Sequence, residues 1–174
     1  DSETAAIAIN SALTGHLVFS TIHTNTSVGV ITRLIDMGME RYLIAPVLIA
    51  ALGQRLSRTI AEGCAVPMEM TPALKEMVTK QFADLPEEFK QKMQIDRPFH
   101  EANGNSEYST GLKGRTPVFE VLNVTDEIEE AIIRSNGEDE IWALARKDGM
   151  VTIKEDAMLK CFAGKIPFTE LAEL

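Results

Sequence analysis

The chain has 174 residues, with 17 Lys and Arg against 26 Asp and Glu, for a formal net charge of −9. That length suits one domain, or a core with an appended subdomain. The acidic balance argues against a face that grips nucleic acid, which needs clustered cations. A hydrophobic fraction of 45% and a charged fraction of 25% are typical of a globular protein, and we find no apolar run long enough for a membrane helix and no secretory signal pattern. The first residue is Asp1 rather than Met, which we interpret as a fragment or a processed product.

The first third of the chain has the pattern of an α/β protein, in which helices alternate with strands. The run over 17–22, LVFSTI, is apolar and β-branched, so it predicts a strand buried on both faces of a parallel sheet. Apolar periodicity predicts helices over 2–13, 27–37 and 42–52, and alternation of polar and apolar residues predicts an edge strand over 54–60.

The remainder divides into a proline- and glycine-rich middle and a regular end. We place domain boundaries at 1–60 for the core, 61–115 for a small insertion, and 116–174 for a returning strand followed by a helical subdomain. Helices are expected to begin at Thr71-Pro72 and Pro86-Glu87. Beyond a loop over 101–114, we expect a strand over 117–124 and helices over 126–135, 138–147, 152–164 and 169–174.

His23 is the strongest candidate for chemistry because it follows the predicted strand, and ligands of open α/β sheets bind beyond the carboxyl ends of strands. Thr21 and Asn25 flank it with further polar groups. An imidazole at that place could contact a phosphate, a metal-bound water or a carboxylate. On spacing alone, a structural role for His23 stays open.

Arg33, Arg55 and Arg58 form a second candidate set, since guanidinium groups suit phosphates and carboxylates of a neighbouring subunit. Ordinary solvated charge is the alternative for all three. The chain has no GxxxxGK(S/T), HExxH, GxSxG or CxxC pattern. The polar groups around His23 therefore supply only part of a catalytic or binding site.

At these residues the chain resembles the C-terminal half of the secretion ATPases, the motors of type II secretion and type IV pilus assembly. Asp1 matches the end of the segment that follows the Walker B motif in that family, and residues 14–25, TGHLVFSTIHTN, match its His box. Further matching blocks follow in order: 32–38 (TRLIDMG), 54–58 (QRLSR), 111–116 (GLKGRT), 119–122 (FEVL) and 149–164.

The resemblance implies a fold and an activity. The fold is the C-terminal part of a RecA-like P-loop ATPase core, working as a hexameric ring in the cytoplasm, peripheral to the membrane. The intact protein would bind ATP and Mg²⁺, His23 would approach the γ-phosphate or the catalytic Glu, and Asp1, Thr21, Asn25, Arg33, Arg55 and Arg58 would serve the nucleotide site or subunit contacts. Its partners would be copies of itself and inner-membrane platform proteins, with no nucleic acid.

The chain departs from the family at the insertion, where many members hold zinc with four cysteines. Those positions fall at Ala61, Cys64, Gly104 and Glu107, and one thiolate cannot make a closed tetrahedral site. We therefore expect no zinc, and an insertion held by packing.

Because the phosphate loop is missing, we also expect this chain alone to be inactive. The alternative function is a non-catalytic interaction module that kept the same fold.

Overall fold

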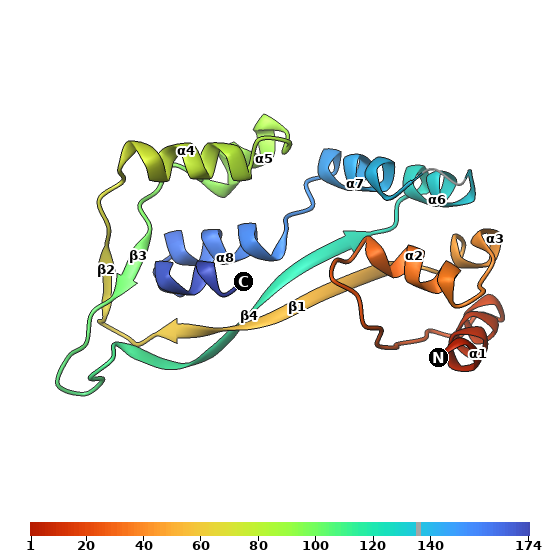
Figure 1. Ribbon diagram of the computed structural model, residues 1–174, viewed down its shortest axis with the longest axis horizontal. Helices are drawn as coiled ribbons and strands as arrows, with labels where there is room; N and C mark the ends of the chain where they lie inside the picture. Colours follow the sequence, from red (N-terminus) through yellow and green to blue (C-terminus); the bar gives the residue numbers. More distant parts are fainter. Residues whose placement is uncertain (135–136) are drawn as a thin grey trace. The chain divides into compact units, whose positions relative to one another are not determined.

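The computed structural model describes residues 1–134 and 137–174 (Figure 1). They form two compact units, a first unit of residues 1–53 and 121–150 and a second unit of residues 54–120 and 151–174. The elements in chain order are α1 Ser2–Leu13, α2 Gly29–Asp36, α3 Arg41–Ile44, β1 Ala50–Ile60, β2 Ala65–Pro67, α4 Pro72–Gln81, α5 Glu87–Met93, β3 His100–Ala102, β4 Leu112–Asn123, α6 Asp126–Ile133, α7 Glu138–Lys147, α8 Ile153–Phe162 and the 3₁₀ helix η1 Phe168–Ala172. The sequence-based division into 1–60, 61–115 and 116–174 follows chain order and stays a prediction.

The first unit is a small helical assembly around one apolar core. Helix α3 packs against α1, α2 and α6, and α6 packs against α7. Apolar residues of α2, α6 and α7 meet the ends of β1 and β4 in this core, whose buried members are Val28, Ile31, Ala45, Ala51, Leu122, Ile128, Ala131, Ile132, Ile141, Ala145 and Met150. Val28 and Ile31, two members of the apolar periodicity that predicted the helix over 27–37, thus lie on the buried side of this segment.

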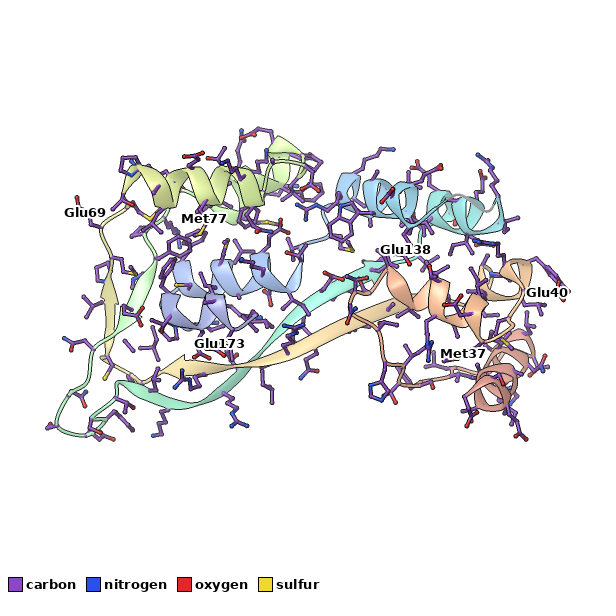
Figure 2. All side chains as sticks on the ribbon, in the orientation of Figure 1. Met37, Glu40, Glu69, Met77, Glu138 and Glu173 are labelled. Carbon is purple, nitrogen blue, oxygen red and sulfur yellow. The ribbon has the colours of Figure 1, made fainter. Side chains whose placement is uncertain are left out.

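The second unit has its own core between α4, α8 and η1. Helix α4 starts at a Thr71 cap, whose hydroxyl accepts the Leu74 N–H at 3.3 Å. Met77 lies on the side of α4 that faces α8 (Figure 2). The buried members of this core are Val78, Phe82, Leu85, Phe99, Val118, Ala157, Met158, Cys161, Phe162, Ile166 and Leu171.

Two small sheets complete the fold. Strand β1 pairs with β4, and β2 pairs with β3 in an antiparallel register that sets Ala65 opposite Ala102. The strands predicted at 54–60 and 117–124 are confirmed as β1 and β4, and each is longer than expected. Within the described residues, none of the helices has both the length and the apolar character needed to cross a membrane.

The predicted buried strand over 17–22 is wrong for this chain. The segment has no regular secondary structure, and the Leu17 and Phe19 side chains are 72% and 88% exposed. A parallel strand needs neighbours that accept and donate its backbone hydrogen bonds. None of the strands in the described part of the chain pairs with this segment, so Leu17 and Phe19 face solvent, while Val18 and Ile22 are half-buried.

The predicted helix over 42–52 is also wrong beyond its first turn. Helix α3 ends at Ile44, and β1 begins at Ala50. Pro46 explains the break because it has no N–H to donate to the turn before it. Four residues later the chain is extended, and the Val124 N–H donates to the Ile49 carbonyl at 3.0 Å just before β1 begins.

Most helices with local start signals are confirmed. Thr152 and Glu155 form a capping box at α8, with hydrogen bonds of 3.1 and 2.8 Å between each side chain and the other's backbone N–H. Helix α6 starts at Asp126, as predicted. The expected end of that helix at Ser135 lies outside the described residues.

Candidate functional site

The candidate site lies on the coil that joins α1 to α2 in the first unit (Figure 1). This coil leaves α1 in a defined direction, since the Thr14 hydroxyl donates to the Ser11 carbonyl at 2.8 Å. His16 Nδ1 lies 3.1 Å from both that carbonyl and the Thr14 hydroxyl. Gly15 has φ +91°, a left-handed backbone that a residue with a side chain rarely adopts. His16 is therefore tied to the end of α1.

His23 lies near the other end of the coil with its side chain exposed, as are Thr21 and Asn25. The structure thus gathers these three predicted residues on one solvent-facing segment. An exposed imidazole is accessible to a partner supplied by another part of a protein. The catalytic role of His23 stays a prediction.

The turn after His23 is anchored on the start of α2. The Thr24 hydroxyl donates to the Thr26 carbonyl at 2.9 Å, and the Thr26 hydroxyl accepts the Gly29 N–H at 3.1 Å. Ser27 and Val28 are buried in the first unit. The polar turn is therefore fixed on one side by the core and open on the other.

Asp1 and Arg33 also belong to the first unit. The Asp1 carboxylate caps α1 by accepting a hydrogen bond from the Thr4 N–H at 2.8 Å. Capping alone explains an acidic residue at a helix start, without any further ligand. Arg33 is exposed on the last turn of α2. Asp1 therefore caps a helix, and its contribution to a nucleotide site stays a prediction, as does that of Arg33.

Arg55 and Arg58 belong to the second unit, where both hold the C-terminal segment. Arg55 Nη1 donates to the Leu174 carbonyl at 2.6 Å. Arg58 Nη2 forms an ion pair with Glu170 Oε1 at 2.6 Å, and Arg58 Nε donates to the same oxygen at 2.7 Å. The other oxygen, Oε2, accepts the Arg58 backbone N–H at 2.8 Å and the Ser57 hydroxyl at 3.2 Å.

The charge on Glu170 is stabilised by these contacts. Burial alone would raise the pKa of this carboxyl, but the hydrogen bonds from the Arg58 backbone and side chain outweigh burial and lower the pKa. The same side-chain hydrogen bond raises the pKa of Arg58. No local pattern in the sequence indicates this pairing, because Glu170 follows Arg58 by 112 residues.

The described residues contain no group of three or more His, Cys, Asp and Glu that could hold a metal ion. Cys64 and Cys161 are both free and buried. Burial raises the pKa of the Cys161 thiol to about 11, so that thiol stays protonated and unreactive at neutral pH.

Comparison with known proteins identifies the family. A model of the family described as type II/IV secretion system protein matches residues 1–173. A type II secretion system protein E of Xanthomonas campestris pv. campestris is 39% identical over 98% of this chain and 29% of its own length. The type IV pilus assembly ATPase PilB of Thermus thermophilus is also 39% identical, over 94% of this chain and 18% of its own. This chain therefore spans less than a third of the length of either relative.

A solved structure shares the fold. The crystal structure of the pilus retraction motor PilT with bound ADP superposes with a TM-score of 0.61 and 21% identity, over 99% of this chain and 36% of that chain. The α/β fold class predicted from the sequence is confirmed, and so is the resemblance to secretion and pilus ATPases. Taken with the match over residues 1–173, these likenesses show that the chain belongs to the type II/IV secretion system protein family.

Proposed function

We propose that this chain is part of a motor subunit that binds and hydrolyses ATP to power type II secretion or type IV pilus assembly. The observation that carries the proposal is the family match over residues 1–173. Relatives that are named as an ATPase or a motor support it.

His23 is the residue we assign to the reacting nucleotide in the intact protein. Its exposed imidazole could donate a hydrogen bond to the γ-phosphate or to the carboxylate that activates water. The exposed hydroxyl of Thr21 and amide of Asn25 add polar groups on the same segment. Asp1, Arg33, Arg55 and Arg58 are weaker candidates for the same site or for subunit contacts.

The remaining parts of the nucleotide site would come from elsewhere in the protein. This chain has no GxxxxGK(S/T) loop to cradle phosphates, and the described residues offer no acidic cluster for Mg²⁺. Phosphoryl transfer depends on positioning and charge neutralisation, so we expect the 174-residue chain alone to show no ATP turnover. Turnover by the pure chain would refute this part of the proposal.

The exposed run over 17–22 supports a place within a larger sheet. Burying a side chain such as Leu17 or Phe19 contributes about 1.5–3 kcal/mol, and here both are largely in solvent. Strands supplied by the rest of the protein would bury this run and bring His23 to the edge of a sheet. A RecA-like core is the arrangement we propose for it.

We extend the proposal to assembly and place in the cell. The intact subunit would form a ring of six at the cytoplasmic face of the inner membrane and act on platform proteins of the secretion or pilus machine. The formal charge of −9 is consistent with no nucleic-acid partner.

The test compares His23→Ala with His16→Ala in the intact protein. Both imidazoles are exposed, but His16 is bonded at the end of α1, so it is a matched control. We expect His23→Ala to lower kcat by about 100-fold or more and His16→Ala to leave it close to normal, with circular dichroism unchanged in both. Equal and near-normal turnover would return His23 to a structural role. No turnover in the unmodified intact protein would favour a non-catalytic interaction module.

A further inference from the structure

The end of the insertion is formed by two loops that lie against each other, and we call them the tip. One is the turn over 61–64 after β1, and the other is the loop over 103–111 between β3 and β4. The Ala61 N–H donates to the Gly111 carbonyl at 2.8 Å, and the Asn103 N–H donates to the Cys64 carbonyl at 2.9 Å. Backbone hydrogen bonds therefore join the two loops directly.

A small apolar cluster fills the space under these loops. Ile60, Ala61 and Cys64 are buried, Cys64 to 1% exposure, and Ala102 and Tyr108 pack against them. The Tyr108 hydroxyl also accepts a hydrogen bond from Lys113 Nζ at 2.6 Å. Tyr108 thus has its ring against the buried cluster and its hydroxyl bonded to β4.

The longer loop is further fixed by bonds of its own. The Asn105 side-chain oxygen accepts the backbone N–H groups of Glu107 and Tyr108 at 2.9 and 2.8 Å. The Tyr108 carbonyl accepts the Asn105 and Gly111 N–H groups at 3.0 and 2.9 Å. A Cβ placed on Gly104 would meet the Ser109 carbonyl oxygen at 2.1 Å, so the loop closes around a position that has no room for a side chain.

These residues do not fit the zinc site that the family resemblance implies. Of the four ligand positions, Ala61 and Gly104 have no donor side chain, Cys64 is packed in the apolar cluster, and Glu107 is exposed. A closed zinc site needs four ligands in a tetrahedron. The close approach of Ser109 to Gly104 also excludes a cysteine at that position without opening the loop.

We infer that the tip folds without a metal. The packing of Tyr108 on the cluster of Ile60, Ala61 and Cys64, with the backbone hydrogen bonds between the loops, holds together the two loops that zinc would otherwise join, and the close contact at Gly104 fixes the shape of the longer loop. Folding of a zinc-dependent tip would be linked to metal binding and lost to chelators. Here the linking groups are an aromatic ring, a thiol that acts as a small apolar group, and backbone hydrogen bonds.

The first test measures metal content and its effect. The 174-residue chain, expressed with added zinc and purified, should contain far less than one zinc per molecule by mass spectrometry. Its thermal midpoint should not change when a strong zinc chelator is added. One bound zinc per chain, with a lower midpoint after chelation, would overturn the inference.

The second test asks whether the named residues hold the tip, with hydrogen exchange of the Ala61 and Asn103 amides as the measurement. Gly104→Ala should raise exchange of both amides by about tenfold or more. Gly137→Ala is the matched control, since nothing lies within 4 Å of a Cβ placed there. Exchange that rises no more in Gly104→Ala than in the control would contradict the inference.

Tyr108 variants separate the ring from the hydroxyl. Tyr108→Ala removes both and should accelerate exchange of the same amides, whereas Tyr108→Phe keeps the ring and should preserve most of the protection. Protection that survives in Tyr108→Ala would show that the ring does not hold the tip, and would count against the proposal even if no zinc is found.

Discussion

Replacing Glu170 tests the energetics of the C-terminal segment. The Glu170 side chain is 8% exposed, and its two carboxylate oxygens accept hydrogen bonds from the Ser57 hydroxyl, the Arg58 backbone N–H and the Arg58 guanidinium. Glu170→Ala removes these acceptors, so the Arg58 N–H loses its partner and the Ser57 hydroxyl keeps only the Arg58 carbonyl at 3.5 Å. A buried donor left unpaired costs about 1–3 kcal/mol, so we expect a loss of about 3 kcal/mol in the free energy of unfolding.

Glu170→Gln should cost less, because an amide has one acceptor oxygen and a donor NH₂ group. The amide oxygen can accept hydrogen bonds either from the Ser57 hydroxyl and the Arg58 backbone N–H, or from the Arg58 guanidinium. In either orientation the NH₂ group faces the remaining donors and cannot accept from them. We expect a loss of about 2 kcal/mol, the value of one hydrogen bond to a charged group. The Arg58 side chain is 60% exposed, so solvent screens its ion pair and the pair itself adds little.

Urea denaturation measures the free energy, and hydrogen exchange of the Arg58 amide reports the local change because that N–H donates to Glu170. Glu173→Gln is the control, since it removes the same charge from an exposed carboxylate later in the same C-terminal segment. If Glu170→Ala destabilised the chain no more than Glu173→Gln, the reasoning from the buried hydrogen bonds would be refuted.

The same network sets a pH dependence. The pKa of Glu170 is lower in the folded chain than its ordinary value of 4.5, so its contribution is complete above that value and declines as the pH falls through the lowered pKa. In the Glu170→Gln variant this part of the acid dependence should disappear. A difference between the two proteins that stayed constant from pH 7 down to pH 3 would contradict it.

Three further predictions concern single side chains. In a Cys64→Ala variant, Cys161 should react with Ellman's reagent at pH 8 only as fast as the chain unfolds, because its thiol is buried and has a pKa of about 11. Rapid labelling of the folded chain would argue against this. Thr152→Ala should lower the free energy of unfolding by about 1 kcal/mol through loss of the capping box at α8, measured by urea denaturation, and Thr152→Ser should restore most of it; a fully stable Ala variant would show that the cap contributes nothing. Phe19→Ser should leave the thermal midpoint of this chain unchanged, because the ring is 88% exposed, yet lower that of the intact protein if the proposed larger sheet buries it; no change in the intact protein would count against that sheet.

Local signals in the sequence predicted the helices well. The residues that start these helices act within a few positions of the helix start, so the local sequence is enough to predict where each helix begins. They are Thr152 and Glu155 at α8, Thr71 and Pro72 at α4, and Asp126 at α6. Pro46 is a local signal of the same kind, and the prediction of a helix over 42–52 failed because it ignored it.

Features that depend on distant groups were not predictable. The run over 17–22 has the composition of a buried strand, but a strand forms only beside partners that no pattern within the run supplies. Thr21, His23 and Asn25 share one segment because they are close in the sequence, and their exposure is seen only in the structure. The contact of Arg58 with Glu170 and the closure of the tip by Tyr108 join residues through the fold, so no spacing indicates them.

The bare run over 17–22 has a consequence for how the chain behaves in solution. An unpaired, β-branched and uncharged stretch is a template onto which another molecule can add a strand. The charge of −9 opposes that encounter by mutual repulsion, and salt screens the repulsion. Light scattering should therefore report particles that grow with ionic strength and concentration, and a single Lys in place of Phe19 should suppress their growth.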